Sequence, residues 1–334
     1  MSIPARFAPS PATLAGENTD IYFLRARQIL EAEGMAPDVI MEVFANAEGL
    51  LCGMQEALAL LAQVLPRAAQ VEALPEGAEI ARKEVVLRIR APYPSFALYE
   101  TALLGMLAHE TGWATAARRC VLAAAETPVI SFGARHVHPD VSARMEYAAM
   151  IGGCAGCATP AGAALAEIEA SGTLPHALIL CFGDTVAAVQ AFDRLMPPSV
   201  RRIALVDTFK DEAEESLRVA AALGDRLWGV RLDTPSERGR VTAELVKEVR
   251  ARLDQAGHTQ VKIVVSGGID AERIRYFRQH AAPVDAFGVG SAISGAAPID
   301  FTADIKEIAG RPVAKRGRIP GLTPNPRLQS WTPT

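Results

Sequence analysis

Short apolar runs alternate with helix-forming segments through the second half of the chain, and this alternation most constrains the fold. From Pro128 onward the runs recur about every 25 to 30 residues and are rich in Val, Ile and Leu. Near-continuous apolar strands between helices are typical of parallel β/α units. The expected strands lie within residues 128–133, 176–184, 201–208, 226–234, 261–268 and 284–290. Helices are expected between them, for example over 212–223 and 236–253.

Six consecutive units favour a closed barrel over an open sheet, because closure leaves no pair of long edge strands. Eight clean units are not found, so the prediction is a distorted or incomplete β/α barrel. The first 110 residues or so are mixed. They predict a helix over 18–34 that Asn18 or Thr19 caps, strands over 38–45 and 84–93, and then two helices broken near Gly112.

Composition excludes several classes of protein. The chain has 334 residues, of which 50% are hydrophobic and 22% charged, as in a soluble globular protein of roughly two domains. A net charge of −4 argues against a nucleic-acid partner. No apolar run approaches the ~18 residues of a membrane span, and the first residues lack a signal-peptide core. Five scattered cysteines indicate reduced thiols and a cytoplasmic protein.

Charged and polar residues follow the predicted strands. In β/α barrels the chemistry lies at the carboxyl ends of the strands, so these side chains are expected around one opening. They are Arg135, His136, Asp184, Thr185, Asp207, Thr208, Arg231 and Asp233. Thr and Asp before a helix are also typical N-caps, so for Thr185 and Thr208 capping and ligand contact both remain open.

Two glycine turns end the last two predicted strands. One is Ser266-Gly267-Gly268, and the other contains Gly288, Gly290 and Ser291. Glycine permits positive φ and close approach of a ligand to the main chain, and free amides at such a turn favour an anion. Tight turns without a ligand are the alternative. The occurrence of a pair on neighbouring strands favours a phosphate site, as at the seventh and eighth strands of many barrels.

Several longer motifs occur in a fixed order across roughly residues 18–318. They are TDIYF, GMQEALALL, ETALLGMLAH, FGARHVHPDVSARMEYAAMIGGCAGCATPAGAAL, SGTLPHALI, LVDTFKDE, GVRLDTPSERG, VSGGID, GVGSAIS and PVAKRGR. As a set they resemble nicotinate phosphoribosyltransferases, in particular their compact archaeal-type branch. Quinolinate phosphoribosyltransferases share the barrel and the glycine turns but lack GTLPHA and DTFKDE in this form.

The resemblance implies a fold and a reaction. The fold is an irregular β/α barrel of the type II phosphoribosyltransferase kind over residues 113–294, beside an N-terminal α/β domain over 1–112 to which 295–334 returns. The reaction converts nicotinate and phosphoribosyl pyrophosphate (PRPP) to nicotinate mononucleotide and pyrophosphate, for NAD salvage. Mg²⁺ accompanies PRPP, and ATP hydrolysis is coupled in most members of the family.

The resemblance also assigns roles to residues. His176 takes the place of a histidine that ATP phosphorylates, and Asp207 and Asp233 stand beside the reacting ribose or Mg²⁺. Asp20 and Tyr22 match a motif that reaches the pyridine pocket of a neighbouring subunit, which implies a homodimer or larger assembly with shared sites. The remaining expected substrate contacts are Arg135, Thr173, Lys210, Arg231, Ser266, Gly267, Gly268, Gly288, Gly290 and Ser291. For Lys210, an exposed lysine at a helix start is an equal alternative. A core aromatic is an equal alternative for Tyr22.

No metal-ligating cysteine set is expected. Cys154 and Cys157 form one CxxC pair, which is half of a zinc site, and small buried thiols are the favoured interpretation. Archaeal-type relatives can end in a cysteine-rich module, whereas no cysteine follows Cys181, so no structural zinc is predicted. Two other functions stay open: a decarboxylating quinolinate enzyme, and a silent relative that only binds a phosphorylated metabolite.

Overall fold

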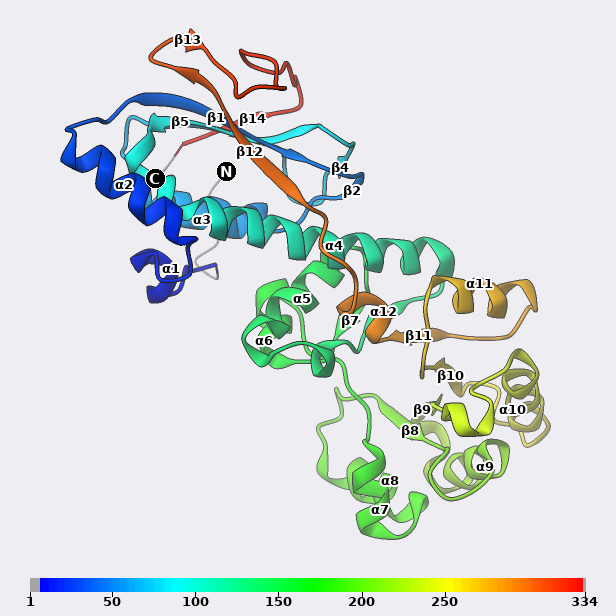
Figure 1. Ribbon diagram of the computed structural model, residues 1–334. Helices are drawn as coiled ribbons and strands as arrows, with labels where there is room; N and C mark the ends of the chain where they lie inside the picture. The colour runs from blue at the N-terminus through cyan, green and yellow to red at the C-terminus, as the bar shows by residue number, and fades with distance from the viewer. Residues whose placement is uncertain (1–6, 333–334) are drawn as a thin grey trace. The chain divides into compact units, whose positions relative to one another are not determined.

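The computed structural model describes residues 7–332, which form two compact units (Figure 1). The first unit takes the residues up to Thr115 together with those from Ala297 onward, and the second takes Ala116–Ala296. Among the described residues, no helix combines the length and the apolar character that crossing a membrane requires.

The first unit is built on an antiparallel sheet in the order β13-β12-β1-β5-β3-β14. Its strands are β1 (Asp38–Ala45), β3 (Gln70–Ala73), β5 (Val85–Pro92), β12 (Phe301–Ile308), β13 (Arg311–Pro312) and β14 (Gln329–Trp331). A small separate ladder pairs β2 (Gly49–Leu50) with β4 (Glu79–Ile80). The chain thus returns to this unit after residue 297 and supplies strands on both sides of the first ones.

One face of this sheet is apolar and packs on helices. In β5 buried and half-buried residues alternate over most of the strand, as expected of a strand with one covered face. The helices of the unit are α1 (Pro11–Ala15), α2 (Ile21–Ala32), α3 (Met54–Val64) and the first part of α4 (Glu100–Ala124), which continues into the second unit. Short 3₁₀ turns are η1 (Tyr93–Ser95) and η2 (Ala97–Tyr99). Asp20 is the N-cap residue of α2, rather than the predicted Asn18 or Thr19.

The predicted break near Gly112 is wrong, because α4 is one helix of 25 residues. A Cβ atom on residue 112 would overlap the carbonyl oxygen of Ala297. Gly112 therefore permits a close approach of the returning chain and does not end the helix.

The second unit contains a parallel sheet in the order β7-β6-β11-β10-β9-β8. Its strands are β6 (Val129–Ser131), β7 (Gly156–Cys157), β8 (Arg202–Leu205), β9 (Leu227–Leu232), β10 (Lys262–Val265) and β11 (Ala286–Val289). The α-helices are α5 (Pro139–Ile151), α6 (Pro160–Ala166), α7 (His176–Phe182), α8 (Thr185–Leu195), α9 (Glu212–Leu223), α10 (Ala243–Gln255), α11 (Ala271–Gln279) and α12 (Ser291–Ser294). The 3₁₀ turns are η3 (Ala134–His136), η4 (Gly224–Arg226) and η5 (Ser236–Arg238).

The predicted fold class, an incomplete β/α barrel with an α/β domain that the end of the chain completes, is confirmed. In the part of the chain that the structure describes, β7 and β8 are the two edges of the sheet and do not pair with each other. The barrel is therefore half-closed. The carboxyl ends of β6, β8, β9, β10 and β11 lie along one rim of this curled sheet, where parallel strands present their following loops.

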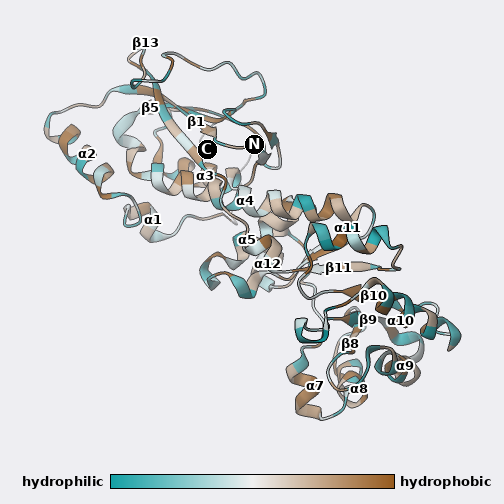
Figure 2. Ribbon diagram, turned by 45° about the vertical axis from the view of Figure 1, so that its right-hand side comes forward, coloured by the Kyte–Doolittle hydropathy of each residue, from teal (hydrophilic) through white to brown (hydrophobic). Residues whose placement is uncertain are grey.

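The run over residues 176–184 is a helix and not the predicted strand. Pro175 precedes α7 in an extended conformation, and Gly183 ends it with a φ of 71°. Leu180 and Phe182 are 58% and 47% exposed, whereas a strand within a parallel sheet would be covered on both faces. Figure 2 shows α7 brown over most of its length, so its hydropathy alone does not separate a buried strand from this helix.

Candidate active site

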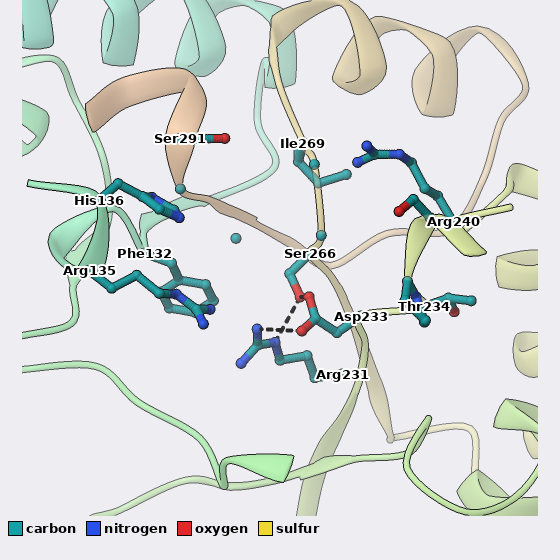
Figure 3. A pocket seen from close by; sticks show the side chains of 16 residues that line it. Phe132, Arg135, His136, Arg231, Asp233, Thr234, Arg240, Ser266, Ile269 and Ser291 are labelled. Atoms are coloured by element: carbon teal, nitrogen blue, oxygen red, sulfur yellow. Dashed lines mark hydrogen bonds and ion pairs between the residues drawn. The ribbon is translucent and has the colours of Figure 1, made fainter. Parts of the chain in front are cut away.

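A pocket of about 230 Å³ lies at the carboxyl ends of the parallel strands (Figure 3). Phe132, Arg135 and His136 line one side of it, and Thr234 and Arg240 lie across from them. The other residues at its wall include Arg231, Asp233, Ser266, Gly267, Gly268, Gly288, Gly290 and Ser291. The structure therefore brings together most of the residues that the sequence pattern placed at the strand ends.

The first glycine turn follows β10 in a conformation that suits glycine. Gly267 and Gly268 have φ values of 84° and 65°, in the left-handed region that other residues rarely adopt. Among the described residues, no hydrogen bond uses the N–H groups of Gly267, Gly268 or Ile269. These amides are free to receive an anion.

The second glycine turn, after β11, is defined by close packing. A Cβ atom on residue 288 would overlap the ring of Phe132, and one on residue 290 would lie 3.0 Å from the His136 ring. The N–H of Ser291 donates no hydrogen bond within residues 7–332. Since α12 has only four residues, an anion here would rely on these amides rather than on a helix dipole.

His176, at the start of α7, faces two carboxylates. Its Nε2 lies 3.6 Å from Asp207 Oδ2 and 3.7 Å from Asp233 Oδ2. Its Nδ1 lies 3.0 Å from the hydroxyl of Thr208. Three segments that are distant in sequence thus hold one imidazole between two acids, and Asp233 connects this group to the pocket.

The carboxylate of Asp207 lies in an environment that is unfavourable for a charged group. Its side chain is only 1% exposed, and both carboxylate oxygens are buried without a hydrogen-bond partner among the described residues. Burial, with a further contribution from Asp233, raises its pKa to about 6, although His176 opposes the shift. A hard cation such as Mg²⁺ would satisfy these oxygens, so Asp207 and Asp233 fit a magnesium site.

Arg231 is held on several sides. Its Nε donates to Ser266 Oγ at 2.8 Å, and a terminal nitrogen donates to Thr173 Oγ1 at 3.2 Å. The other terminal nitrogen pairs with Asp233 at 3.3 Å, and the guanidinium lies 5.0 Å from the centroid of the Phe132 ring. Ser266 also donates to Asp233 at 2.7 Å. The position of this cation is therefore fixed before any ligand binds.

A neighbouring hollow of about 270 Å³ shares three residues with the pocket. These are Phe132, Arg135 and Arg231, and Thr173 lines the hollow as well. Arg135 has no ion-pair partner in the described part of the chain. It is a free cation where the two hollows meet.

Some predicted contacts lie elsewhere. Lys210 is 40% exposed and pairs with Glu214 at 2.6 Å, one turn along the start of α9. Asp20 and Tyr22 belong to the first unit, where the Tyr22 hydroxyl donates to Asp20 at 3.2 Å. Tyr22 is 57% exposed, so the alternative of a core aromatic is wrong.

Thr185 and Thr208, which the sequence left open as N-caps or ligand contacts, do not cap helices. Asp184 caps α8 and Asp211 caps α9, each by accepting backbone N–H groups. Thr208 instead contacts His176, and Thr185 is buried as the first residue of α8.

Several residues of the pocket wall were not predicted from the sequence, among them Phe132 and Arg240. Phe132 follows β6 directly, and its position at the end of a strand could have marked it. Arg240 follows a 3₁₀ turn and adopts a φ of 64°, which no local pattern predicts.

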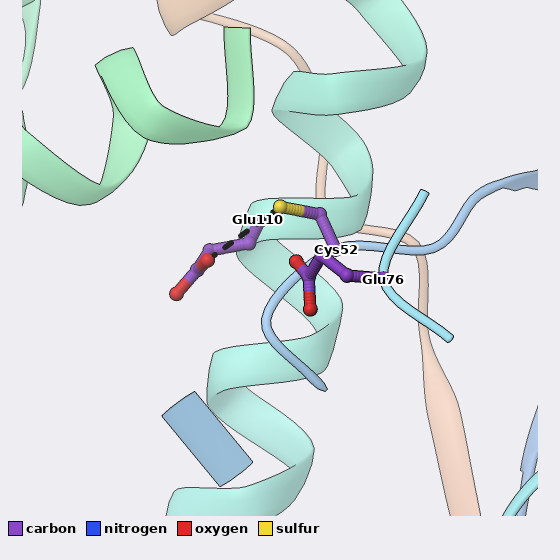
Figure 4. Close-up of side chains that lie close together, drawn as sticks. All are labelled: Cys52, Glu76 and Glu110. Atoms are coloured by element: carbon purple, nitrogen blue, oxygen red, sulfur yellow. Dashed lines mark hydrogen bonds between the residues drawn. The ribbon is translucent and has the colours of Figure 1, made fainter. Parts of the chain in front are cut away.

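A second group of ionisable residues, in the first unit, comprises Cys52, Glu76 and Glu110 (Figure 4). Their ligand atoms lie within 4.8 Å of one another. The thiol of Cys52 donates to Glu110 at 3.6 Å, and burial raises the pKa of Cys52 well above its usual value. Glu76 accepts the N–H groups of Gly53 and Gln55 at 2.7 and 2.8 Å. The thiol of Cys52 is thus protonated, and Glu76 binds backbone N–H groups at the start of α3. The cluster therefore stabilises the start of this helix.

Cys154 and Cys157 are free and buried. Burial raises the pKa of both thiols, that of Cys157 to about 11.

Comparison with known proteins gives consistent matches. The family described as "Quinolinate phosphoribosyl transferase, C-terminal domain" matches residues 113–304, and its N-terminal domain matches 20–111. A nicotinate phosphoribosyltransferase of Mycobacterium tuberculosis is 34% identical over 67% of this chain and 48% of its own length. That of Bacillus subtilis is 30% identical over 65% and 44%. The chain spans about half the length of the curated relatives it matches.

Solved structures are also similar. A nicotinate-nucleotide pyrophosphorylase from Pyrococcus furiosus is 44% identical with a TM-score of 0.87, over 94% of this chain and 81% of that one. Human nicotinic acid phosphoribosyltransferase is 22% identical with a TM-score of 0.73, over 91% and 77% of the two chains, which indicates a shared fold.

Proposed function

The chain belongs to the quinolinate and nicotinate phosphoribosyltransferase family, and from that premise we propose that it transfers phosphoribosyl from PRPP to nicotinate. The products are nicotinate mononucleotide and pyrophosphate, as in NAD salvage. The observation that carries the proposal is one rim where free amides, arginines and a histidine between two acids meet. A sugar with phosphates at two positions requires such a set of groups.

The glycine turns would bind the 5′-phosphate. The unused N–H groups after β10 and β11 line the same pocket and supply donors without charge. The acids would act at the other end of the sugar. Asp207 and Asp233 would hold Mg²⁺, and the bound ion would supply positive charge against the pyrophosphate leaving group. The same carboxylates favour the positive charge that develops on the ribose ring.

The pyridine acid would bind where the pocket and the adjoining hollow meet. The face of Phe132 offers a surface on which a flat ring can stack. The guanidinium of Arg231 already lies near this phenyl ring. Arg135 is free to pair with one carboxylate, whereas Arg231 is engaged by Asp233, Ser266 and Thr173. Where the pocket and the hollow meet, Arg135 is the one unengaged arginine among the described residues, which favours nicotinate, with one carboxylate, over quinolinate, with two.

His176 would couple the reaction to ATP. Since Nδ1 is held by Thr208, Nε2 is the nitrogen assigned to accept a phosphoryl group. This nitrogen faces the two acids, and a cation held by them would supply positive charge that offsets their repulsion of a phosphoryl group. Asp20 and Tyr22 are exposed and would complete the site of a second copy, which makes the enzyme a homo-oligomer.

A steady-state assay tests this function. The purified chain is given PRPP and Mg²⁺ with nicotinate, nicotinamide or quinolinate, each with and without ATP. Nicotinate should be the preferred acceptor, and ATP should raise the yield of mononucleotide. His176→Ala should abolish the ATP effect while some transfer remains.

Other outcomes would contradict specific parts of the proposal. Transfer to quinolinate with release of CO₂ would select the decarboxylating alternative. ATP hydrolysis unchanged in His176→Ala would refute the role of this histidine. Binding of PRPP without transfer to any acceptor would indicate a silent relative.

A further inference from the structure

Arg240 occupies an unusual backbone position beside the pocket. It follows Gly239, and both residues have positive φ values, 64° for Arg240 and 88° for Gly239. Left-handed backbone is uncommon for a residue with a side chain. Its N–H donates to the carbonyl of Pro235 at 3.1 Å, which closes the loop on itself. The backbone of residues 235–240, called here the arginine loop, therefore fixes the direction in which the Arg240 side chain leaves the loop.

Both ends of the arginine loop are fixed to buried groups. Before it, Thr234 is buried and donates to Glu212 at 2.7 Å. After it, Val241 is fully buried, and its carbonyl accepts from Arg273 at 2.5 Å. The loop is thus a positioned part of the pocket wall.

The guanidinium of Arg240 lies directly over the first glycine turn. A Cβ atom on residue 268 would overlap a terminal nitrogen of Arg240, so only glycine at 268 permits this approach. In the described part of the chain the guanidinium has no hydrogen bond or ion pair, although its charge acts on Glu237 of the same loop. Arg231 differs, because three neighbours already engage it.

We propose that Arg240 is the cation that binds the 5′-phosphate of the sugar, closing over the free amides of Gly267 and Gly268. This rests on the proposed function for the identity of the sugar phosphate. The amides and the planar guanidinium would face a phosphate monoester from two sides, and a guanidinium can donate to two phosphate oxygens at once. The arginine loop would then determine affinity for the phosphate and not the chemistry at the other end of the ribose.

Ribose 5-phosphate and inorganic phosphate are the probes for this role, and calorimetry measures their binding to the full chain. Arg240→Gln should weaken ribose 5-phosphate binding by about 10-fold to 100-fold, the range for a hydrogen bond to a charged group. The KM for PRPP should rise by a similar factor, with kcat and the KM for nicotinate nearly unchanged. Arg240→Lys, which keeps the charge but not the fork, should fall between.

Arg238→Gln is the matched control. Arg238 lies two residues away in the same loop, is 58% exposed, does not line the pocket, and is 4.0 Å from its nearest acid. It should bind ribose 5-phosphate as the wild type does. A melting curve shows that each variant is folded.

The outcomes separate this role from the proposed function. Equal binding of ribose 5-phosphate by the wild type and Arg240→Gln, or no binding by the wild type, would overturn the role of Arg240. Weakened binding by Arg240→Gln alone supports the role, even if the wild type transfers phosphoribosyl to no pyridine acid. That last result would refute only the proposed function.

Discussion

At the scale of one residue, Asp207 is a functional side chain that lowers the stability of the folded protein. Its carboxylate is buried without a hydrogen-bond partner among residues 7–332, and its pKa is raised to about 6. A raised pKa means that the folded state disfavours the ionised form. The cost is absent below the ordinary pKa of 3.8, grows between 3.8 and 6, and is constant above 6.

Asp207→Asn should therefore stabilise the protein above pH 6. A shift of about two pKa units corresponds to roughly 3 kcal/mol at most. The free energy of unfolding, measured with denaturant in the absence of Mg²⁺ and PRPP, should exceed that of the wild type at pH 8. The excess should shrink as the pH falls from 6 to 4, and phosphoribosyl transfer should be lost.

Asp184→Asn provides a comparison of opposite sign. Arg218 lowers the pKa of Asp184, so this substitution should reduce stability at neutral pH. A gain for Asp207→Asn that is the same at pH 4 and pH 8 would show that the charge of Asp207 is not the cause.

Sequence patterns reached some residues of the site and not others. Asp207 and Asp233 lie at strand ends that strand periodicity and family motifs both marked. Only the family motif marked His176, and the structure brings its imidazole within 4 Å of both acids. Arg240 was missed because its approach to Gly268 depends on the backbone of a loop 28 residues earlier in the chain. Such a contact between loops leaves no periodic signal.

At the scale of elements, the two glycines of α4 differ in the space that a side chain would find. A Cβ on Gly112 would overlap the carbonyl of Ala297, whereas nothing lies within 4 Å of one on Gly105. Alanine is a better helix former than glycine by about 1 kcal/mol in both places. Packing should reverse that preference at residue 112 only.

Gly112→Ala should lower the free energy of unfolding, and Gly105→Ala should raise it by about 0.5 to 1 kcal/mol. Denaturant unfolding of the two variants beside the wild type provides the measurement, and each serves as the control for the other. Equal stabilisation by both would mean that the chain at Ala297 can move away without cost.

The type of an element was predicted best where the apolar run had the length of a strand and turn residues bounded it. The strands β1 and β5 occur close to the residues, 38–45 and 84–93, where the sequence predicted them. The run at 176–184 was mistaken for a strand because six consecutive apolar residues, from Ala177 to Phe182, fit either a strand or a helix. The strand β7, of two residues, is too short to give a pattern, so the edge of the half-barrel was not foreseen.

At the scale of the molecule, the first unit is assembled from both ends of the described chain. Trp331 is 5% exposed and packs into the core of this unit, and its strand pairs with β3. The end of the described chain therefore contributes Trp331 to this hydrophobic core.

Trp331→Ala should lower the free energy of unfolding by about 3 to 5 kcal/mol. Hydrogen exchange should accelerate in β3 and β5, while β9 and β10 of the other unit keep their protection. Ile319→Ala is the control, since Ile319 is 82% exposed in the same returning segment. Faster exchange in β9 and β10 alone would contradict this account.

The return of the chain has a consequence for biosynthesis. A ribosome completes the whole parallel half-barrel, through residue 296, before it makes β12. Until then β1 has β5 on one side and an open edge on the other, which can pair with a foreign strand. A nascent chain that stalls before β12 is made would carry a complete half-barrel and a sheet with an aggregation-prone edge at β1. Chaperones that cover this edge during translation would prevent it from pairing with strands of other chains.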